Sequence, residues 1–511
     1  MGLTSPSWGR QCRRQGLTTL RAVWWALSLA LLSSRAGSQL SSERSCFCKL
    51  SEAVDECECS LGSVDVFNNR HLHPLLQNIL QRNFFRYYKV NMDTPCPYWQ
   101  SEGQCSSRKC GIETCDDRVP ASLKQPLRFQ APRPPADCGS AGGEQPCEEG
   151  CESGTGNALD PLDSSLTQQE LDQIDSWTEH DDAENNFCDV GDEQSEGAHY
   201  VDLLRNPERY TGYKGDSAQN VWKAIYKENC FKPHPKYDRN FLLYPTISGL
   251  CLEKRVFFRL ISGLHTSITV SIAAHNYQPP ATAAPTAMWG GATAEDEEAL
   301  GGRWIRNVEM FKARFSPETT WGEGPERLKN LYFAYLLEMR ALSKAAPYLR
   351  DELFYTGDAR EDAETRDAVG QLVALLGHAH HNHFFDESAM FQYGEADNRK
   401  LKEEFRTKFL NISRIMDCVE CDKCRLWGKV QAHGIGTALK ILFSTPPTPT
   451  VGRGSGSSTS RPRAAQPAPG PPPFKLTRND VVALLQSLGR FSASIWEVNE
   501  FRQILTGRGS S

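Results

Sequence analysis

Three cysteines at strict three-residue intervals are the residues of this chain best suited to chemistry. Cys418, Cys421 and Cys424 lie within the stretch Asp-Cys-Val-Glu-Cys-Asp-Lys-Cys-Arg-Leu-Trp. A C-x-x-C pair on a helical turn can form an easily reduced disulfide, and the neighbouring cations Lys423 and Arg425 would help to stabilise a thiolate. A zinc site needs a fourth ligand, and no cysteine follows Cys424 in the sequence. The spacing therefore favours redox chemistry, with structural bridges and a metal site as open alternatives.

Two further cysteine groups precede this motif. Cys105 and Cys110 lie among Gly, Ser, Glu and charged residues, which is typical of an exposed loop where an exchangeable disulfide could reach a partner. Another group forms a near-palindrome of two C-x-C pairs, which predicts two nested structural bridges, Cys46–Cys59 and Cys48–Cys57. Zinc is the alternative there, although C-x-C is tighter than the usual zinc spacing.

The N-terminus decides in which compartment these thiols work. Several arginines precede an apolar run at 22–32, and small residues stand at 34, 36 and 38. This pattern predicts a signal peptide, 1–38, cleaved near 36–38. The apolar run is short for a membrane-spanning helix, so a signal anchor is the less favoured alternative. No other segment looks apolar enough to cross a bilayer, and we expect a lumenal or secreted protein.

An oxidising compartment changes what the cysteine count means. The chain has 18 cysteines, and Cys12 leaves with the signal peptide, so 17 remain. Most should be paired, and an odd number requires at least one free or exchanging thiol. Asn411 begins the N-x-S motif expected for glycosylation. The chain ends without a KDEL-type signal, so retention in the endoplasmic reticulum would need a partner.

The rest of the sequence predicts a mainly α protein. Apolar residues keep helical spacing over 328–342 and over 401–419, and the second stripe runs straight into the three cysteines. If that helix continued, the three sulfurs would lie within an arc of about 120°. Thr477 and Asp480 predict the capped start of one more helix, and strand-like alternation is scarce.

Three segments differ from this helical texture. Between Asp137 and Gly197 the chain has 18 acidic residues and no Lys or Arg, which predicts a solvated, low-order segment over about 137–198. Residues 445–473 form a Pro/Gly-rich insert, and 281–302 are rich in Ala, Gly and acids. The net charge of −6 excludes a strongly basic chain and gives no indication of a nucleic-acid partner.

Several blocks together resemble a known family. The stretch 418–429 with 434–443 resembles the active-site region of the endoplasmic reticulum oxidoreductins, the Ero family of FAD-dependent thiol oxidases. Further similar blocks are 85–91, 206–215, 260–265 and 322–332, so the resemblance extends with gaps from about 46 to 505. It implies a single helical domain, 39–511, with a helical bundle that holds FAD, a disulfide-rich N-terminal region, flexible loops and a mobile shuttle loop at about 96–151.

The resemblance also implies roles for individual residues. The FAD-binding positions would be Arg209, Thr211, Trp222, Ser262, His265, Arg314 and Arg327. Arginines pair with pyrophosphate, and Trp and His can stack on or bond to rings. Taken without the family, the Trp and His would be core residues and the arginines surface charges. Gly434-x-Gly436 is a weak dinucleotide fingerprint, because it lacks a preceding strand and a third spaced glycine.

By the same resemblance, Cys421–Cys424 is the inner disulfide beside the flavin and Cys105–Cys110 the outer shuttle disulfide. Reduced protein disulfide isomerase, or a related thioredoxin-fold oxidoreductase, would attack the shuttle, and the electrons would pass through the inner pair and FAD to O2, giving hydrogen peroxide. The expected location is the endoplasmic reticulum lumen, with peripheral attachment to the membrane as an option.

The remaining cysteines take structural or regulatory roles in this scheme. Cys96–Cys418 and Cys230–Cys251 would be structural bridges. Cys105–Cys151 and Cys110–Cys115 would be regulatory bridges that remove the shuttle disulfide. Cys188 would be the odd free thiol, and Cys138 and Cys147 depart from the family pattern. Two other classes stay open: a non-enzymatic, disulfide-stapled secreted binding module and a lumenal zinc protein.

Overall fold

The computed structural model describes residues 61–99, 110–124, 186–188, 191–213, 216–231, 251–278, 303–351, 354, 356–378, 385, 387–392, 395–444 and 474–507. All of them belong to one compact unit, Phe47–Ser511. The predicted signal peptide, the bridges among Cys46, Cys48, Cys57 and Cys59, and Cys105, Cys138, Cys147 and Cys151 lie outside the described residues. So do the inserts 281–302 and 445–473.

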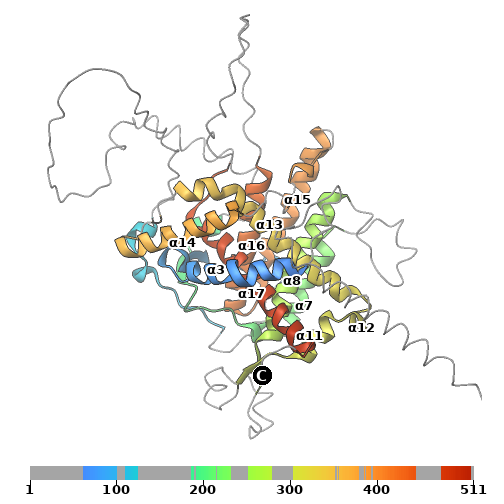
Figure 1. The fold of residues 1–511 in the computed structure, drawn as a ribbon. Helices are drawn as coiled ribbons and strands as arrows, with labels where there is room; N and C mark the ends of the chain where they lie inside the picture. Colours follow the sequence, from blue (N-terminus) through green and yellow to red (C-terminus); the bar gives the residue numbers. More distant parts are fainter. Residues whose placement is uncertain are drawn as a thin grey trace, which may run out of the picture. The chain divides into compact units, whose positions relative to one another are not determined.

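In the part of the chain that the structure describes, four long helices build the core. They are α8 (Leu252–Ala274), α13 (Glu323–Asp351), α16 (Asp422–Phe443) and α17 (Arg478–Leu505). The last helix, α17, packs against the other three, and α13 packs against α8 and α16. Segments far apart in the sequence therefore lie side by side (Figure 1). Their apolar side chains join one continuous buried cluster. The expected mainly α fold is therefore confirmed.

The predicted start of α17 is also confirmed. The Thr477 side chain accepts a hydrogen bond from the Asp480 backbone N–H, and the Asp480 carboxylate accepts one from the Thr477 N–H. This reciprocal capping box satisfies backbone donors that a helix N-terminus otherwise leaves unpaired.

One core helix differs from the expectation that only the N-terminus is apolar enough to cross a membrane. Among the described residues, α8 has the length and hydropathy of a membrane span, with a mean hydropathy of 1.4. Of its most apolar window, 78% is buried inside the protein. A central core helix of a folded domain has the same composition, so the finding is weak evidence for a membrane span.

Shorter helical segments surround these four. They are α2 (Leu61–Phe67), η1 (Asn68–Leu72), α3 (His73–Leu80), α4 (Asn83–Arg86), η2 (Asp116–Arg118), η3 (Ala121–Lys124), α6 (Gly191–Gln194), η4 (Tyr210–Gly212), α7 (Asp216–Lys223), η5 (Ala224–Asn229), α11 (Val308–Phe315), α12 (Pro317–Thr320), α14 (Ala359–His378), η8 (Glu387–Ala389), α15 (Glu395–Ile415) and η9 (Met416–Cys418).

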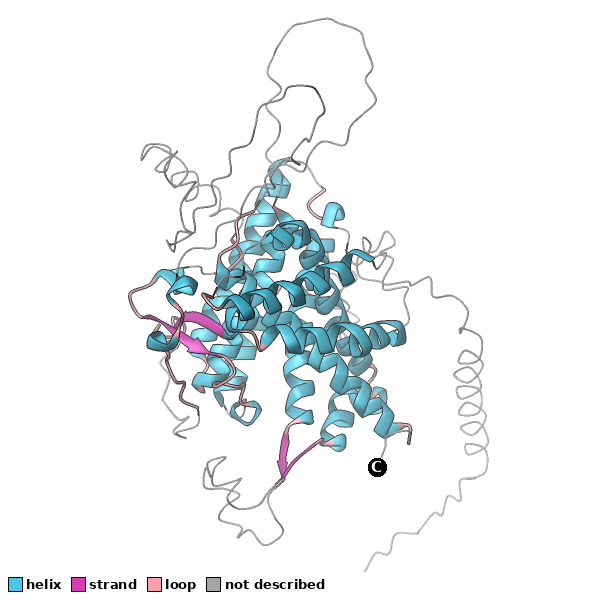
Figure 2. Ribbon diagram, turned by 60° about the vertical axis from the view of Figure 1, so that its left-hand side comes forward, coloured by secondary structure: helices cyan, strands magenta, loops and turns pink. Residues whose placement is uncertain are grey.

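Within the described residues, two small antiparallel sheets accompany the helices (Figure 2). In one, β1 (Tyr87–Asn91) pairs with β2 (Ala198–Asp202); in the other, β3 (Asn276–Gln278) pairs with β4 (Arg303–Ile305). The first sheet matters for the cysteines, because the Cys115 N–H donates to the Tyr200 carbonyl at 2.8 Å. The chain that carries Cys110 is thereby tied to β2.

The prediction of one continuous helix through the three cysteines is wrong. The helix α15 ends at Ile415, a 3-10 turn follows to Cys418, and Cys421 has the extended dihedral angles φ −76° and ψ 112° before α16 begins. The physical reason is that hydrogen bonds to a distant residue replace the backbone hydrogen bonds that a helix would make here. The Ser217 hydroxyl bonds the Cys418 carbonyl at 3.5 Å and accepts from the Glu420 N–H at 3.4 Å, so groups that a helix would pair internally are paired elsewhere.

The weak glycine motif of α16 serves helix packing. A Cβ on Gly434 would lie 2.4 Å from the Ala483 carbonyl oxygen of α17. The missing side chain therefore lets α16 and α17 approach closely. This glycine lies within a helix and not at a phosphate-binding turn, as the weakness of the fingerprint indicated.

Candidate active site

The inner cysteine pair lies at the start of α16. Cys421 is the residue before the helix, Cys424 lies in its first turn, and their exposed fractions are 2% and 0%. Both are free thiols in the structure. Each sulfur lies 2.5 Å from the point that a Cβ on Gly212 would occupy, so the sulfurs are at most twice that distance apart. The pair is held close together and sealed from solvent by η4.

The two thiols have opposite electrostatic environments. The hydrogen bond from Cys424 lowers the pKa of Cys421, with a further contribution from the positive charge of Arg209. Burial raises the pKa of Cys424 well above its usual value, and the Arg209 carbonyl, 3.3 Å from its sulfur, is an alternative acceptor for its one proton. The helix N-terminus also favours negative charge beside it. Cys421 is therefore the thiol of the pair that ionises first.

The predicted shuttle cysteine Cys110 packs against this pair. Cys110, Cys421 and Cys424 form a buried cluster of their own. The Lys423 N–H donates to the Cys110 carbonyl at 2.8 Å, so the first turn of α16 holds the Cys110 backbone directly. Cys110 is disulfide-bonded, and its partner lies outside the described residues, because each other described cysteine is either free or joined elsewhere.

Cys115, the predicted regulatory partner of Cys110, is a buried free thiol here. Burial raises the pKa of Cys115 to about 11. The Cys110–Cys115 bridge is therefore not formed in this structure, and the thiol is poorly ionised at neutral pH. Its proposed role and that of Cys151, which lies outside the described residues, stay predictions.

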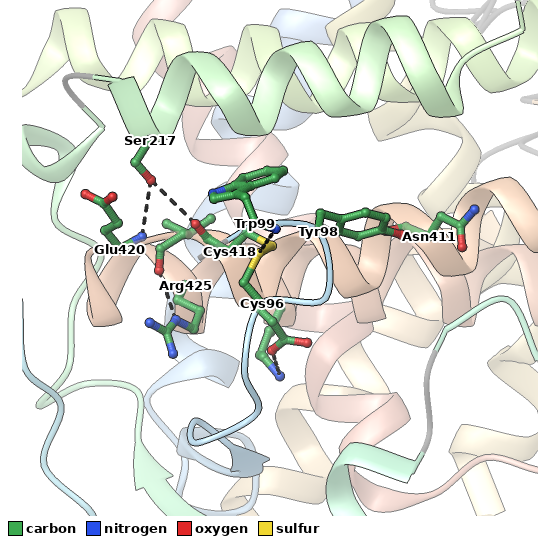
Figure 3. The surroundings of a disulfide bond; sticks show 11 residues. Cys96, Tyr98, Trp99, Ser217, Asn411, Cys418, Glu420 and Arg425 are labelled. Carbon is green, nitrogen blue, oxygen red and sulfur yellow. Dashed lines mark hydrogen bonds and ion pairs between the residues drawn. A yellow bond between two sulfur atoms is a disulfide. The ribbon is translucent and has the colours of Figure 1, made fainter. Parts of the chain in front are cut away.

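A disulfide fixes the approach to the inner pair. Cys96 and Cys418 are joined, with Cα atoms 4.5 Å apart, as the resemblance implied (Figure 3). On one side the Trp99 N–H donates to the Cys96 sulfur at 3.3 Å. On the other side, the Arg425 side chain donates to the Val419 carbonyl and to the Met92 carbonyl, both at 2.9 Å. The segment before Cys110 is thereby anchored beside the start of α16.

A cavity of about 180 Å³ adjoins the inner pair. Its walls come from η4, α7, α8 and α16, and its lining is mostly apolar. The lining residues are Gly212, Tyr213, Ser217, Ala218, Val221, Trp222, Leu264, Ile268, Met416, Val419, Glu420, Cys421, Cys424, Gly428 and Gln431. It is an apolar space with a dithiol on one wall and few polar groups.

Four of the seven predicted FAD-binding residues gather around the Trp222–His265 pair, of which Trp222 lines this cavity. The rings of Trp222 and His265 stack with centroids 3.7 Å apart and planes 16° apart. Burial, together with the positive charges of Arg327 and Arg314, lowers the pKa of His265 to about 4. Thus α7, α8, α11 and α13 bring a ring stack and two arginines together, and the imidazole is neutral at physiological pH.

The other three predicted residues lie in the same region. The Ser262 hydroxyl accepts from the Asn330 side chain at 3.0 Å. The Arg209 carbonyl meets Cys424, and Thr211 belongs to η4, although its side chain lies outside the described part. The Arg327 guanidinium donates to the Arg314 carbonyl at 3.4 Å, which ties the start of α13 to the end of α11.

One predicted bridge is contradicted. Cys230 and Cys251 are both free thiols. Cys230 closes η5 and is buried in the hydrophobic core, where burial raises its pKa to about 12, while Cys251 stands half-buried just before α8. Each thiol is accommodated in its own packing environment, and the structure shows no bond between them.

Two other predicted positions have clear surroundings. Cys188 is outside any disulfide and donates its thiol to the Ala432 carbonyl at 3.3 Å. Asn411 lies half-buried within α15, where its amide donates to the Asn229 side chain at 3.0 Å. Glycosylation at Asn411 stays a prediction, and a glycan there would cost this hydrogen bond.

The sequence patterns missed several residues of the site. Gly212 and Tyr213 lie within the block 206–215 but carry no metal-ligand or nucleophile chemistry that would single them out. Gly428 and Gln431 follow Cys424 at helical spacing, and that spacing could have predicted their place on its face of α16. A buried ion pair between Glu208 and Arg490, at 2.8 Å, joins residues far apart in sequence, so no local pattern predicts it.

Known proteins resemble this chain over most of its length. A family model described as Endoplasmic Reticulum Oxidoreductin 1 (ERO1) matches residues 71–498. The chain is 51% identical to "Endoplasmic reticulum oxidoreductin-1" of Caenorhabditis elegans, covering 93% of both chains. It is 40% identical to "ERO1-like protein alpha" of Homo sapiens, covering 95% of this chain and 97% of the relative.

A solved structure agrees with this assignment. The structure titled "Structure of Ero1p, Source of Disulfide Bonds for Oxidative Protein Folding in the Cell" is similar with a TM-score of 0.52 and 26% sequence identity, covering 88% of this chain and 99% of that chain. The inner cysteine pair, its adjoining cavity and these similarities agree, and the chain belongs to the endoplasmic reticulum oxidoreductin 1 family, whose members are oxidoreductases acting on thiols.

Proposed function

We propose that this protein is a thiol oxidase of the endoplasmic reticulum lumen that reoxidises protein disulfide isomerase and related thioredoxin-fold oxidoreductases. The observation that carries the proposal is the packing of Cys110 against Cys421 and Cys424, with the Lys423 N–H bonded to the Cys110 carbonyl at 2.8 Å. A shuttle cysteine held against a buried dithiol allows thiol–disulfide exchange between them without opening the core.

Two exchange steps account for the transfer. A reduced substrate dithiol breaks the Cys105–Cys110 bond, becomes a disulfide itself and leaves two shuttle thiols. These thiols then break the Cys421–Cys424 bond, which restores the shuttle disulfide and leaves the inner pair reduced.

The residues around the cavity fit the expected cofactor, FAD. The Trp222–His265 stack provides flat aromatic surface, and the neutral imidazole adds no cationic charge of its own. Arg314 and Arg327 lie near that stack, where guanidinium groups would pair with a pyrophosphate. When bound, FAD would accept the two electrons of the inner dithiol and pass them to O2, giving hydrogen peroxide.

The protein's own part is to direct the thiol chemistry. In the reduced inner pair Cys421 ionises before Cys424, so it is the more nucleophilic of the two sulfurs. Burial of both sulfurs and the apolar cavity keep bulk water from the reacting pair. Because that core admits no folded substrate, the loop carrying Cys105 and Cys110 has to bring the oxidising equivalents to the surface.

Regulation by the alternative bridges extends the proposal. Forming Cys110–Cys115 and Cys105–Cys151 would remove the shuttle disulfide and stop the oxidase. The raised pKa of Cys115 means that this thiol attacks slowly at neutral pH. We therefore expect the first of these bridges to form slowly once the substrate is depleted.

Purification of the full-length chain gives the first test. We expect a yellow protein with bound FAD that consumes O2 in the presence of reduced isomerase. Cys421→Ala should abolish oxygen consumption, while Cys251→Ala, which removes a free thiol at the start of α8, should keep it. A colourless protein with stoichiometric zinc, or one with neither activity nor metal, would contradict the oxidase assignment and favour one of the two alternative classes.

The shuttle requires a separate variant. We expect Cys105→Ala to block turnover with reduced isomerase but to spare part of the turnover with a small dithiol, because a small molecule can reach the inner pair without the loop. Equal loss with both substrates would argue against a shuttle.

A further inference from the structure

One buried polar side chain in the cavity has no role in the chemistry described so far. Gln431 is 1% exposed, and within the described part of the chain neither its amide nitrogen nor its amide oxygen has a hydrogen-bond partner. Each unpaired buried polar group of this kind costs about 1–3 kcal/mol. A ligand that donates one hydrogen bond to the amide oxygen and accepts one from the amide nitrogen would remove this cost.

The position of Gln431 shows which space such a ligand would occupy. Cys424, Gly428 and Gln431 follow one another along one face of α16, and all three line the cavity. The amide-bearing residue stands about 10 Å along the helix axis from Cys424, and helical side chains lean back towards the N-terminus. We place the ring of the ligand between the sulfur and the amide, in the part of the cavity that Met416 borders where its sulfur packs on Gly428.

The rest of the lining is mostly apolar. Val221 and Trp222 of α7 and Leu264 and Ile268 of α8 form the facing walls. A flat aromatic system can be enclosed by such walls. The Tyr213 and Ser217 hydroxyls of the lining already donate to Glu208 and to the Cys418 carbonyl, whereas the Gln431 amide has no partner within the described residues. The pyrimidine edge of a flavin offers carbonyl acceptors on both sides of an N–H donor, and a carboxamide complements two neighbouring groups of that edge.

We propose that Gln431 is a cofactor-binding residue that hydrogen-bonds the pyrimidine edge of the flavin ring and thereby sets both its affinity and its reduction potential. This inference rests on the proposed function, because it takes the cavity ligand to be FAD. The amide N–H donates to a flavin carbonyl, and that bond strengthens when the reduced ring gains negative charge. Losing the bond should weaken binding and make reduction of the flavin less favourable.

Gln431→Met tests the proposal, because Met keeps the length of the side chain and removes both polar groups. After removal and titration of FAD, we expect the full-length variant to bind FAD about tenfold more weakly, to show a shifted flavin absorption band and to have a more negative midpoint potential. The FAD-free variant should unfold at the same denaturant concentration as the FAD-free wild type or at a higher one, because an unpaired amide has been removed.

Gln486→Met is the matched control. Gln486 is also buried, but it lies on α17, and its amide already donates to the Phe85 carbonyl at 3.0 Å. This variant should lose stability and keep the wild-type FAD affinity, absorption band and potential. The two glutamines would thus respond in opposite ways, which a general effect of buried glutamine substitution would not produce.

The outcomes separate the two proposals. If the wild type binds FAD and Gln431→Met binds it with the same affinity and potential, the role of Gln431 is wrong and the oxidase assignment stands. If the wild type binds no FAD, both fail. Gln431→Asn keeps the amide on a shorter side chain; if it and Gln431→Met both fail to fold, Gln431 has a structural role and the proposal is overturned.

Discussion

Gly212 shows how much a single missing side chain contributes to this site. The point where its Cβ would be lies 2.5 Å from both inner sulfurs, well inside any normal non-bonded contact. A glycine here lets the backbone of η4 close directly over the dithiol. The residue has no chemistry of its own, yet the position of the reacting atoms depends on it.

We expect Gly212→Ala to push η4 away from the cysteine pair and to lower turnover on the order of 100-fold, since displacements near 1 Å at reacting groups have effects of that size. Oxygen consumption with both reduced isomerase and a small dithiol is the measurement, because the inner pair serves both substrates. Gly370→Ala is the control: Gly370 lies in α14 with no atom near its missing Cβ. It should keep full activity and gain up to about 1 kcal/mol of stability.

His265 makes the folded chain sensitive to acid. Its pKa is lowered from 6.5 to about 4, first by burial and then by Arg327 and Arg314. Between these two pH values the unfolded chain binds a proton at this residue and the folded chain does not, so stability falls as the pH falls. The linked free energy is about 3 kcal/mol over the whole window.

Denaturant unfolding of wild type and His265→Gln, measured from pH 7 down to pH 4, checks this expectation. The variant should lose less stability than the wild type over that interval, because it has no imidazole to protonate. The same pH profile for both proteins would show that His265 does not protonate on unfolding.

At the scale of elements, the start of α16 is the feature that makes the cysteines reactive. The sequence pattern predicts a helix that continues through Cys418, but the helix begins only after Cys421. The inner pair therefore lies at a helix N-terminus and not in a helix interior. Unpaired N–H groups and the helix dipole favour a thiolate there, and one of those N–H groups, that of Lys423, holds Cys110.

Because the hydrogen bond from Cys424 is the main reason for the lowered pKa of Cys421, we expect Cys424→Ala to raise the pKa of Cys421. Ultraviolet thiolate absorbance of the reduced protein, followed against pH, measures it. Burial raises the pKa of Cys115 to about 11 and that of Cys230 to about 12, so these two thiols absorb only at higher pH, and the difference between the wild type and the variant isolates the inner pair. If the pKa of Cys421 is the same in the variant as in the wild type, the helix N-terminus and Arg209, and not Cys424, are the cause of the lowered pKa.

At the scale of the whole molecule, the Cys96–Cys418 disulfide joins residues 322 positions apart. Cys96 belongs to the segment that precedes the shuttle cysteines, and Cys418 lies in the turn just before the inner pair, so the bond joins these two segments. The two cysteine pairs of the proposed electron path are thus held near one another by a covalent bond that belongs to neither pair.

We expect the double variant Cys96→Ala/Cys418→Ala to lose about 2–5 kcal/mol of unfolding free energy, since a bridge that closes a long loop constrains the unfolded chain strongly. Denaturant unfolding without reductant measures the loss. Cys251→Ala, which removes an unbridged thiol, should lose less. A double variant as stable as this control would show that the bridge contributes little to folding.

Local sequence patterns predicted much of the fold. The apolar stripes over 328–342 and 401–415 are helices, and Thr477 and Asp480 start a capped helix as expected. These features depend on neighbours within a few residues, which is what periodicity and capping motifs record. The break before Cys421 was missed because it depends on Ser217 and on the bridge to Cys96, both distant in sequence.

The sequence by itself determined which residues can exchange electrons: the cysteine types, their spacing and the family blocks identify an oxidoreductin. Only the tertiary structure decided which sulfur ionises first, that Cys110 packs on the inner pair, that Cys230 and Cys251 are free thiols, and that Gly212 and Gln431 line the cavity beside the pair. The physical reason is that burial, hydrogen bonding and close packing arise from segments that meet only on folding, and no local pattern of residues records them.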